Sequence, residues 1–183
     1  MERQKNEVWE WTKALLIAAG LAAIIRFFLF SPIVVDGSSM VPTLHNGERM
    51  IMNKISYQFK EPDRFDIVVF HAPGNKDYIK RVIGLPGDEI QYKDDVLYIN
   101  GEAYDEPYLD EYKKEYPGTH YTKDFSLEEV INQSTVPEGH IFVLGDNRPV
   151  SQDSRTIGSV NIEEIVGNTS IVFWPVGNVR NVE

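Results

Sequence analysis

Apolar positions divide the chain into one continuous N-terminal run and many short runs. Residues 14–25 are all apolar or Gly, and after Arg26 the apolar run resumes over 27–30. Ser31 and Pro32 end any helix there, because proline disfavours the helical conformation of the residue before it. These 17 positions lie at the low end of what crosses a hydrocarbon core of about 30 Å at about 1.5 Å per residue. The pattern predicts one N-terminal transmembrane helix.

Two other interpretations of this run stay open. A cleaved secretory signal also has a charged start, an apolar centre and small residues near its end. The aromatic stretch beyond Arg26 makes the apolar run longer than the core of a usual signal peptide. This length favours a retained anchor that spans residues 1–31. A buried helix of a soluble protein is the third interpretation. A cytoplasmic N-terminus follows from the basic residues that precede the span, namely Arg3, Lys5 and Lys13.

Beyond Pro32 the apolar runs are short and rich in β-branched and aromatic residues, which is typical of strands. Turn signals such as Asn100-Gly101 separate them. We expect a mainly β fold, an antiparallel sheet or barrel over residues 32–183. One short helix, Ser126–Asn132, begins with a capping box, and a second helical turn is expected at Asn161–Ile165. The seven predicted strands are Ile33–Val35, Met50–Ile55, Ile67–Phe70, Tyr78–Ile83, Val96–Ile99, Ile141–Leu144 and Ile171–Trp174.

An acidic excursion interrupts this β pattern. Between Lys93 and Asn132 there are 11 Asp or Glu residues against four Lys. We name residues 93–135 the cap and interpret it as an insertion into the main sheet. Charge runs usually form solvated surfaces, so a solvated flap with tyrosines packed beneath it is the expected structure.

Composition narrows the classes of function. The 183 residues include no Cys, and 18 Lys+Arg against 28 Asp+Glu give a net charge of −10. Absence of Cys excludes disulfides, thiolate metal sites and a Cys nucleophile, and the acidic balance disfavours nucleic-acid binding. The four His residues lack metal-ligand spacing, and the chain has no GxSxG elbow and no phosphate-binding Gly loop. We therefore expect no metal, no cofactor and no Ser/His/Asp triad.

Three segments place reactive side chains beside backbone turns. In Gly37–Leu44, Pro42 constrains a turn on which a Ser hydroxyl and free N–H groups can point the same way, as a nucleophile and an oxyanion hole require. In Tyr78–Asp88, strand alternation puts Lys80 on a largely apolar face, where burial can remove its charge. In Gly145–Arg155, alternating Asp and Arg can brace a loop. Each segment taken alone is also explained by an ordinary turn, a solvent-directed Lys or a surface ion pair.

Taken together, the motifs SMxPTL, KRVIGLPGD and GDNRxxSxDSRxxG, in this order, resemble those of bacterial type I signal peptidases. The resemblance covers essentially the whole chain, and the single predicted span resembles the short Gram-positive form. It implies a β-sheet catalytic core with a small inserted cap. It also implies an Ser/Lys endopeptidase that removes signal peptides from exported preproteins after a small residue.

Site residues follow from the resemblance position by position. Ser39 matches the nucleophile, Lys80 the general base and Ser151 the residue that orients the Lys. Met40 matches a residue that shapes the substrate cleft, and four residues match structural ion pairs, namely Arg81, Asp146, Asp153 and Arg155. Some family members use a Ser hydroxyl two residues before the nucleophile in the oxyanion hole. This chain has Gly37 there, so we expect the backbone N–H of Ser39 to dominate, with Ser38 a doubtful helper.

The resemblance implies signal peptides of preproteins and the lipid bilayer as partners, with the catalytic domain outside the cytoplasm on a single-pass anchor. At an ordinary pKa near 10.4, only about one Lys in 2,500 is neutral at pH 7, so burial must lower that pKa by roughly 2 to 4. Two rivals remain, a self-cleaving Ser/Lys repressor-type peptidase and a membrane-tethered β-domain that only binds exported chains. Four apolar residues near the nucleophile are candidates for lipid contact, namely Val41, Leu44, Met50 and Ile51.

Overall fold

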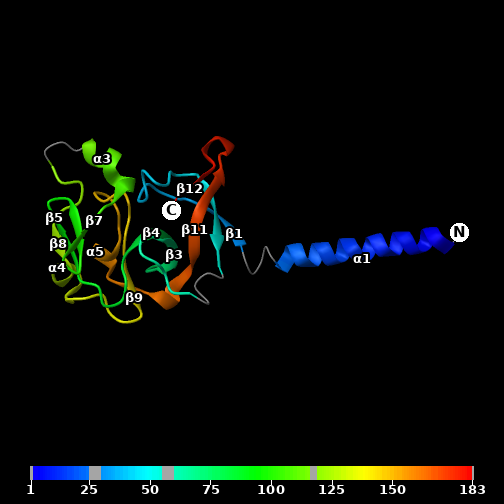
Figure 1. The fold of residues 1–183 in the computed structure, drawn as a ribbon, viewed down its shortest axis with the longest axis horizontal. Coiled ribbons are helices and arrows are strands. Elements are labelled where there is room, and N and C mark those ends of the chain that lie inside the picture. The colour runs from blue at the N-terminus through cyan, green and yellow to red at the C-terminus, as the bar shows by residue number, and fades with distance from the viewer. Residues whose placement is uncertain (1, 25–29, 55–59, 116–118, 183) are drawn as a thin grey trace.

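A computed structural model describes residues 2–24, 30–54, 60–115 and 119–182. Within these residues, two antiparallel sheets form the body of the protein, and one long helix precedes it (Figure 1). This architecture confirms the mainly β, antiparallel fold expected from the short β-branched runs.

The larger sheet carries the segments expected to hold the site. Its strand order is β1-β2-β11-β3-β4-β9-β10, with β12 beside β11, and every pairing is antiparallel. Strand β1 therefore lies at one edge of the sheet, and β4 lies inside it. The strands are β1 (Phe30–Val34), β2 (Arg49–Asn53), β3 (Ile67–Ala72), β4 (Lys76–Gly84), β9 (His140–Leu144), β10 (Val160–Asn161), β11 (Ile165–Trp174) and β12 (Arg180–Asn181).

The smaller sheet contains most of the acidic excursion. Its order is β7-β6-β5-β8, and Asn100-Gly101 joins β6 to β7 with φ of 52° and 81°. Both residues of this two-residue hairpin turn thus have the positive φ that Asn and Gly tolerate. The strands are β5 (Ile90–Lys93), β6 (Val96–Ile99), β7 (Glu102–Tyr104) and β8 (Phe125–Ser126).

The cap is more than a solvated flap. Leu97, Ile99 and Phe125 of the cap are buried in one cluster with Ile83 and Phe142 of the larger sheet. Burying this apolar surface holds the two sheets together. The sequence did not predict β5, because its IQYK pattern contains only two apolar residues that face the core.

Each of the seven predicted strands overlaps a strand of the structure, although residue 55 lies outside the described residues. The predicted helix after Ser126 is α4 (Leu127–Ile131), with both hydrogen bonds of the capping box present. The second predicted helical turn is the 3-10 helix Ile162–Glu164. The remaining short helices are α3 (Asp110–Lys114), α5 (Ser154–Ile157) and the 3-10 helices Pro107–Leu109 and Val176–Asn178.

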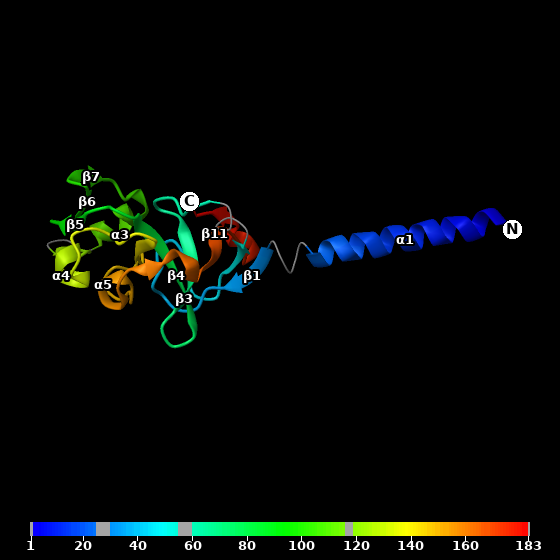
Figure 2. The same cartoon turned by 90° about the horizontal axis from the view of Figure 1, so that it is seen from below.

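Helix α1 (Glu2–Ile24) extends away from the body in both views (Figures 1 and 2). All side chains from 7 to 23 are exposed, including those of Trp9, Trp11 and Leu16, so the interpretation as a buried helix is wrong for these residues. No stretch of α1 within residues 2–24 is both long and apolar enough to qualify as a membrane-spanning helix. Residues 25–29 of the predicted span lie outside the described residues.

A buried cluster anchors the segment that follows β1. Met40 and Leu44 from this segment pack with Met50, Ile67 and Val172 of the larger sheet. Leu44 and Met50 are fully buried, which corrects the expectation that they contact lipid. Together with buried Val35, which precedes the predicted nucleophile, they fix the backbone on either side of it.

Candidate active site

Ser39 lies in the turn between β1 and β2, which we name the nucleophile turn (residues 36–48). The N–H of Val41 donates to the Ser38 carbonyl at 3.2 Å and tightens the turn. Gly37 has φ of +94°, a conformation that side chains disfavour, and its N–H donates to Asn46 Oδ1 at 2.9 Å. Within the described residues, the N–H of Ser39 has no hydrogen-bond acceptor. That N–H is therefore available to a ligand.

Strand β4 brings Lys80 to this turn. Its Nζ donates to Ser39 Oγ at 2.8 Å and to the Ile79 carbonyl at 2.9 Å. Lys80 is only 3% exposed, and its Nζ lies 5.0 Å from the centre of the Tyr78 ring. The structure thus brings the predicted nucleophile and the predicted base into direct contact, although 41 positions separate them in sequence.

Burial makes the Lys80 ammonium lose its proton more easily than that of an ordinary Lys. It lowers the pKa of Lys80 from 10.5 to about 8, against the charges of Asp153 and Asp146, which raise it. About one Lys80 in ten is then neutral at pH 7, which is several hundred times the neutral fraction of an ordinary Lys. A neutral amine can accept the proton of a neighbouring hydroxyl, and an ammonium cannot. The pair can therefore generate a Ser nucleophile near neutral pH.

Ser151 lies beside the main chain of Ser39 rather than on Lys80. Its Oγ is buried and has no hydrogen-bond partner among the described residues. It packs over Gly145, where a Cβ would come within 2.1 Å of this oxygen and 2.5 Å of the Ser39 carbonyl oxygen. Only glycine fits at position 145. The orientation of Lys80 by Ser151 stays a prediction.

Two ion pairs, a buried one and one with a partly exposed Arg, brace the segment after β9, which we name the Gly145 loop (residues 145–153). Arg81 binds Asp146 through Nε–Oδ1 at 3.0 Å and Nη2–Oδ2 at 2.7 Å. Arg155 binds Asp153 in the same two-pronged way, with both distances 2.8 Å. Thr43 of the nucleophile turn donates to Asp146 Oδ2 at 2.5 Å. These contacts tie the nucleophile turn, β4 and the Gly145 loop together.

Sequence reasoning missed two residues of the Gly145 loop. Asn147 donates its N–H to the Ser39 carbonyl and its Nδ2 to the Ser38 carbonyl, both at 3.0 Å. Its place in the GDN motif was the available signal. Arg148 was expected to join the local Asp residues, but its Nη2 contacts Glu106 of the cap at 2.5 Å. No signal distinguished Glu106 from the other acidic residues of the cap.

A cleft of about 540 Å³ opens in front of Ser39 and Lys80. One wall is β1 and the nucleophile turn, and the other is the first half of β4 with Val150 and Gln152. Met40 is among the residues that line the cleft and is itself 2% exposed, and its role in shaping a substrate cleft stays a prediction. An extended peptide in this cleft would pass directly over the Ser39 hydroxyl.

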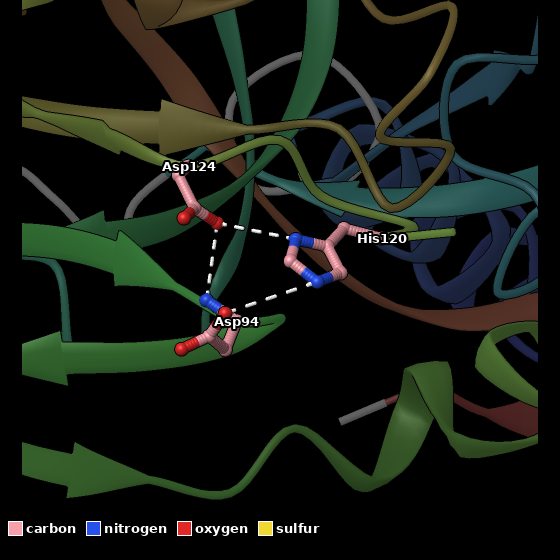
Figure 3. Close-up of side chains that lie close together, drawn as sticks. All are labelled: Asp94, His120 and Asp124. Carbon is pink, nitrogen blue, oxygen red and sulfur yellow. Dashed lines mark hydrogen bonds and ion pairs between the residues drawn. The ribbon is translucent and has the colours of Figure 1, made fainter. Parts of the chain in front are cut away.

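One group of metal-ligating residue types lies elsewhere, in the cap. Asp94, His120 and Asp124 are exposed and close together (Figure 3). The ring nitrogens of His120 face different carboxylates, Nε2 at 3.9 Å from Asp94 Oδ1 and Nδ1 at 3.4 Å from Asp124 Oδ1. His120 thus lies between two carboxylates, and none of the three residues lines the cleft.

Comparison with known proteins assigns the family. The family model described as "Signal peptidase, peptidase S26" matches residues 8–174. The chain belongs to this signal peptidase family. As a signal peptidase it is a serine endopeptidase that processes signal peptides.

Relatives of this signal peptidase match it over nearly their whole length. Signal peptidase I of Bacillus caldolyticus is 49% identical over 174 residues, covering 95% of this chain and 93% of the relative. Signal peptidase IB of Staphylococcus aureus (strain COL) is 40% identical over 181 residues, covering 97% and 95%. The crystal structure of a signal peptidase I from Enterococcus faecalis V583 superposes with a TM-score of 0.57 at 49% identity. It covers 60% of this chain and 97% of that one.

Proposed function

We propose that this signal peptidase uses a Ser39–Lys80 pair to hydrolyse the peptide bond. Neutral Lys80 removes the Ser39 proton as Oγ attacks the scissile carbonyl carbon, and the resulting ammonium donates that proton to the leaving amine. An ester to Ser39 then remains. Lys80 next takes a proton from a water that attacks the ester carbonyl carbon, and it returns this proton to Ser39 Oγ as the ester bond breaks and the acid leaves. The 2.8 Å contact between the two side chains is the observation that carries this proposal.

The oxyanion is proposed to be stabilised by the N–H of Ser39. This group has no other acceptor among the described residues, and Gly37 offers no hydroxyl nearby. Ser38 is exposed, which suits at most a secondary role for its side chain. We assign Ser151 to orienting Lys80 once a substrate occupies the cleft.

An extended substrate is proposed to bind as an added strand. Strand β1 is an edge strand, and residues 77–80 of β4 pair with β3 on one side only, because pairing of β4 with β9 begins at Arg81. Both edges line the cleft on either side of Ser39. Backbone hydrogen bonds can therefore hold any sequence, while alternate side chains enter pockets. Preference for a small residue before the cleaved bond follows from the family resemblance.

The chain is proposed to be a single-pass membrane protein with a cytoplasmic N-terminus. Residues 1–31 are assigned as the anchor and 32–183 as the extracytoplasmic peptidase domain, with the cap (93–135) inserted in it. The apolar residues of α1 between residues 7 and 23 are exposed, as an anchor in lipid requires. Resistance of the full chain to alkaline extraction from membranes tests this assignment, and full release into the soluble fraction would contradict it.

A lipid-facing surface is proposed around β1 and β11, in place of Leu44 and Met50, which are buried. Val34 is 61% exposed on β1, and Trp174 and Val176 near the end of β11 are 48% and 72% exposed. A chain lacking residues 1–31 should bind liposomes through this surface. Absence of binding would count against lipid contact.

The proposed mechanism is tested by processing of a preprotein with an Ala-x-Ala cleavage site. The wild-type chain should release the signal peptide, and Ser39→Ala should not. Equal cleavage by both proteins would remove Ser39 from the mechanism. Binding without cleavage by either would favour the tethered binding domain instead.

A further inference from the structure

The Gly145 loop determines how the nucleophile turn is presented to Lys80. Asn147 holds the carbonyls of Ser38 and Ser39, and Gly145 packs directly against the Ser39 carbonyl. A small displacement of this loop would therefore shift Ser39 relative to the amine. Whatever holds the Gly145 loop is part of the machinery that positions the reaction.

The first contact between the cap and this loop is made by Arg148, which belongs to the loop. Arg148 and Glu106 have side chains that are 0% and 1% exposed, and Arg148 Nη2 lies 2.5 Å from Glu106 Oε1. Arg148 also donates to Thr122 Oγ1 at 3.2 Å and to the Tyr92 hydroxyl. Its Nε donates back to the Gly145 carbonyl at 3.1 Å. One guanidinium thus joins the cap to the first residue of the loop.

The cap supplies a second hold through Tyr121. Its hydroxyl donates to the Asp146 carbonyl at 2.9 Å, and Tyr121 is 2% exposed. The cap fixes this tyrosine in turn, because Asp95 accepts the backbone N–H groups of Tyr121 and Thr122, both at 2.7 Å. These hydrogen bonds fix the backbone at Tyr121 and so hold its hydroxyl in place against the Gly145 loop.

Both contacts between the cap and the Gly145 loop are buried, so the loss of either one costs free energy. A buried ion pair loses much when one partner is removed, because the other charge remains out of water. A buried carbonyl that loses its donor is likewise left unpaired. Solvated charges on a flap would have no such effect on the site.

We infer that Tyr121 and Glu106 are positioning residues, through which the cap holds the Gly145 loop and with it Ser39 against Lys80. This inference rests on the proposed Ser39–Lys80 mechanism. It gives the cap a role in the rate of the chemical step, while the substrate-binding edges of β1 and β4 remain outside its reach.

Tyr121→Phe in the full chain tests this inference, because it removes one hydroxyl and keeps the ring. With a preprotein as substrate, kcat should fall roughly fivefold, as the loss of one ordinary hydrogen bond gives. KM should stay unchanged, and the melting temperature should fall by only about 2–4 °C, so that the protein is still folded at the assay temperature. The matched control is Tyr98→Phe, a half-buried cap tyrosine whose hydroxyl has no hydrogen bond to the Gly145 loop among the described residues.

A second comparison asks whether Tyr121 acts through the loop. In an Asn147→Ala background the loop no longer holds Ser38 by its side chain, so Tyr121→Phe should lower kcat by clearly less than fivefold. Glu106→Gln should lower kcat further than Tyr121→Phe in protein that still melts cooperatively. A Tyr121→Phe enzyme with wild-type kcat overturns the inference, as do fully additive effects with Asn147→Ala or a rate loss that tracks unfolded protein. The wild type and Ser39→Ala are assayed alongside. If the wild type cleaves the preprotein and Ser39→Ala does not, the proposed mechanism stands, and a wild-type kcat in Tyr121→Phe then counts against the inference alone.

Discussion

The amine of Lys80 and the hydroxyl of Ser39 form a 2.8 Å hydrogen bond in a site where Lys80 is 3% exposed. Close contact and loss of water act together here. The contact allows proton transfer, and burial makes the amine able to accept the proton near neutral pH.

Replacement of Lys80 by Arg should abolish processing although it keeps a positive charge. A guanidinium stays protonated at every usable pH, so it cannot take the Ser39 proton. We expect a fall in kcat/KM of roughly 10³-fold or more. Preprotein cleavage at the normal rate by Lys80→Arg would remove the general-base assignment.

Activity should rise with pH through the pKa of Lys80. With that pKa at about 8, the neutral fraction grows from about one tenth at pH 7 to about nine tenths at pH 9. A profile of kcat/KM, which reports the free enzyme, should therefore rise about tenfold across this range. A flat profile between pH 7 and 9, in protein shown to be folded throughout, would contradict the assignment.

Gly145→Ala should damage the site by steric displacement. The added methyl would lie 2.5 Å from the Ser39 carbonyl and 2.1 Å from Ser151 Oγ, so the nucleophile turn or the loop must move. A displacement near 1 Å costs about 100-fold in kcat. Gly177→Ala is the control, because nothing lies within 4 Å of a Cβ there. Equal kcat values for the two variants would show that the loop adapts freely.

Ser151→Ala should lower activity without lowering stability. The buried hydroxyl has no partner among the described residues, so its removal leaves no polar group unpaired. The melting temperature should equal or exceed that of the wild type. Loss of the group proposed to orient Lys80 should lower kcat about tenfold. Full activity in Ser151→Ala would leave the hydroxyl without a function in catalysis.

Arg180→Ala should destabilise the protein in a pH-dependent way. Burial raises the pKa of Glu48, but hydrogen bonds from Arg180 and from the N–H of His45 outweigh it and hold that pKa at about 2. The carboxylate therefore contributes stability above about pH 4.5, and this contribution is lost as the pH falls toward 2.

We expect Arg180→Ala to lower the free energy of unfolding by about 2 kcal/mol at pH 7, because Glu48 keeps a buried charge and Arg180 is partly exposed. The difference from the wild type should narrow toward pH 2 in denaturant titrations. Lys76→Ala removes an exposed cation from β4 and should have no such effect. A deficit that stays constant with pH would show that Arg180 acts by packing alone.

The sequence predicted the parts of the fold that local pattern controls. Runs such as Ile67–Phe70 are strands because their side chains suit a buried pleated surface, and Ser126 caps a helix through its own neighbours. Strand β5 escaped prediction because pairing with β6 and β8, rather than its own composition, makes it a strand.

The sequence predicted the site residues that stand in motifs. It did not predict those whose role depends on contact between distant segments. Ser39 and Lys80 stand in recognisable motifs. Glu106 is one of many acidic residues in the cap, and only its encounter with Arg148, 42 positions away, makes it a buried partner. Solvation is the general rule for such charges, so tertiary contact overrides what composition indicates.

The brace at Arg180 also sets an order of events in time. Its Nη2 donates to the Thr43 carbonyl at 2.7 Å, and both of its Nη atoms bind Glu48 at 2.8 Å. Thr43 of the nucleophile turn is synthesised 137 positions before the Arg180 side chain that holds it. A nascent chain that stops before residue 180 contains Ser39 and Lys80 without the lock that fixes them. The nucleophile turn is therefore fixed in this way only after residue 180 has been synthesised.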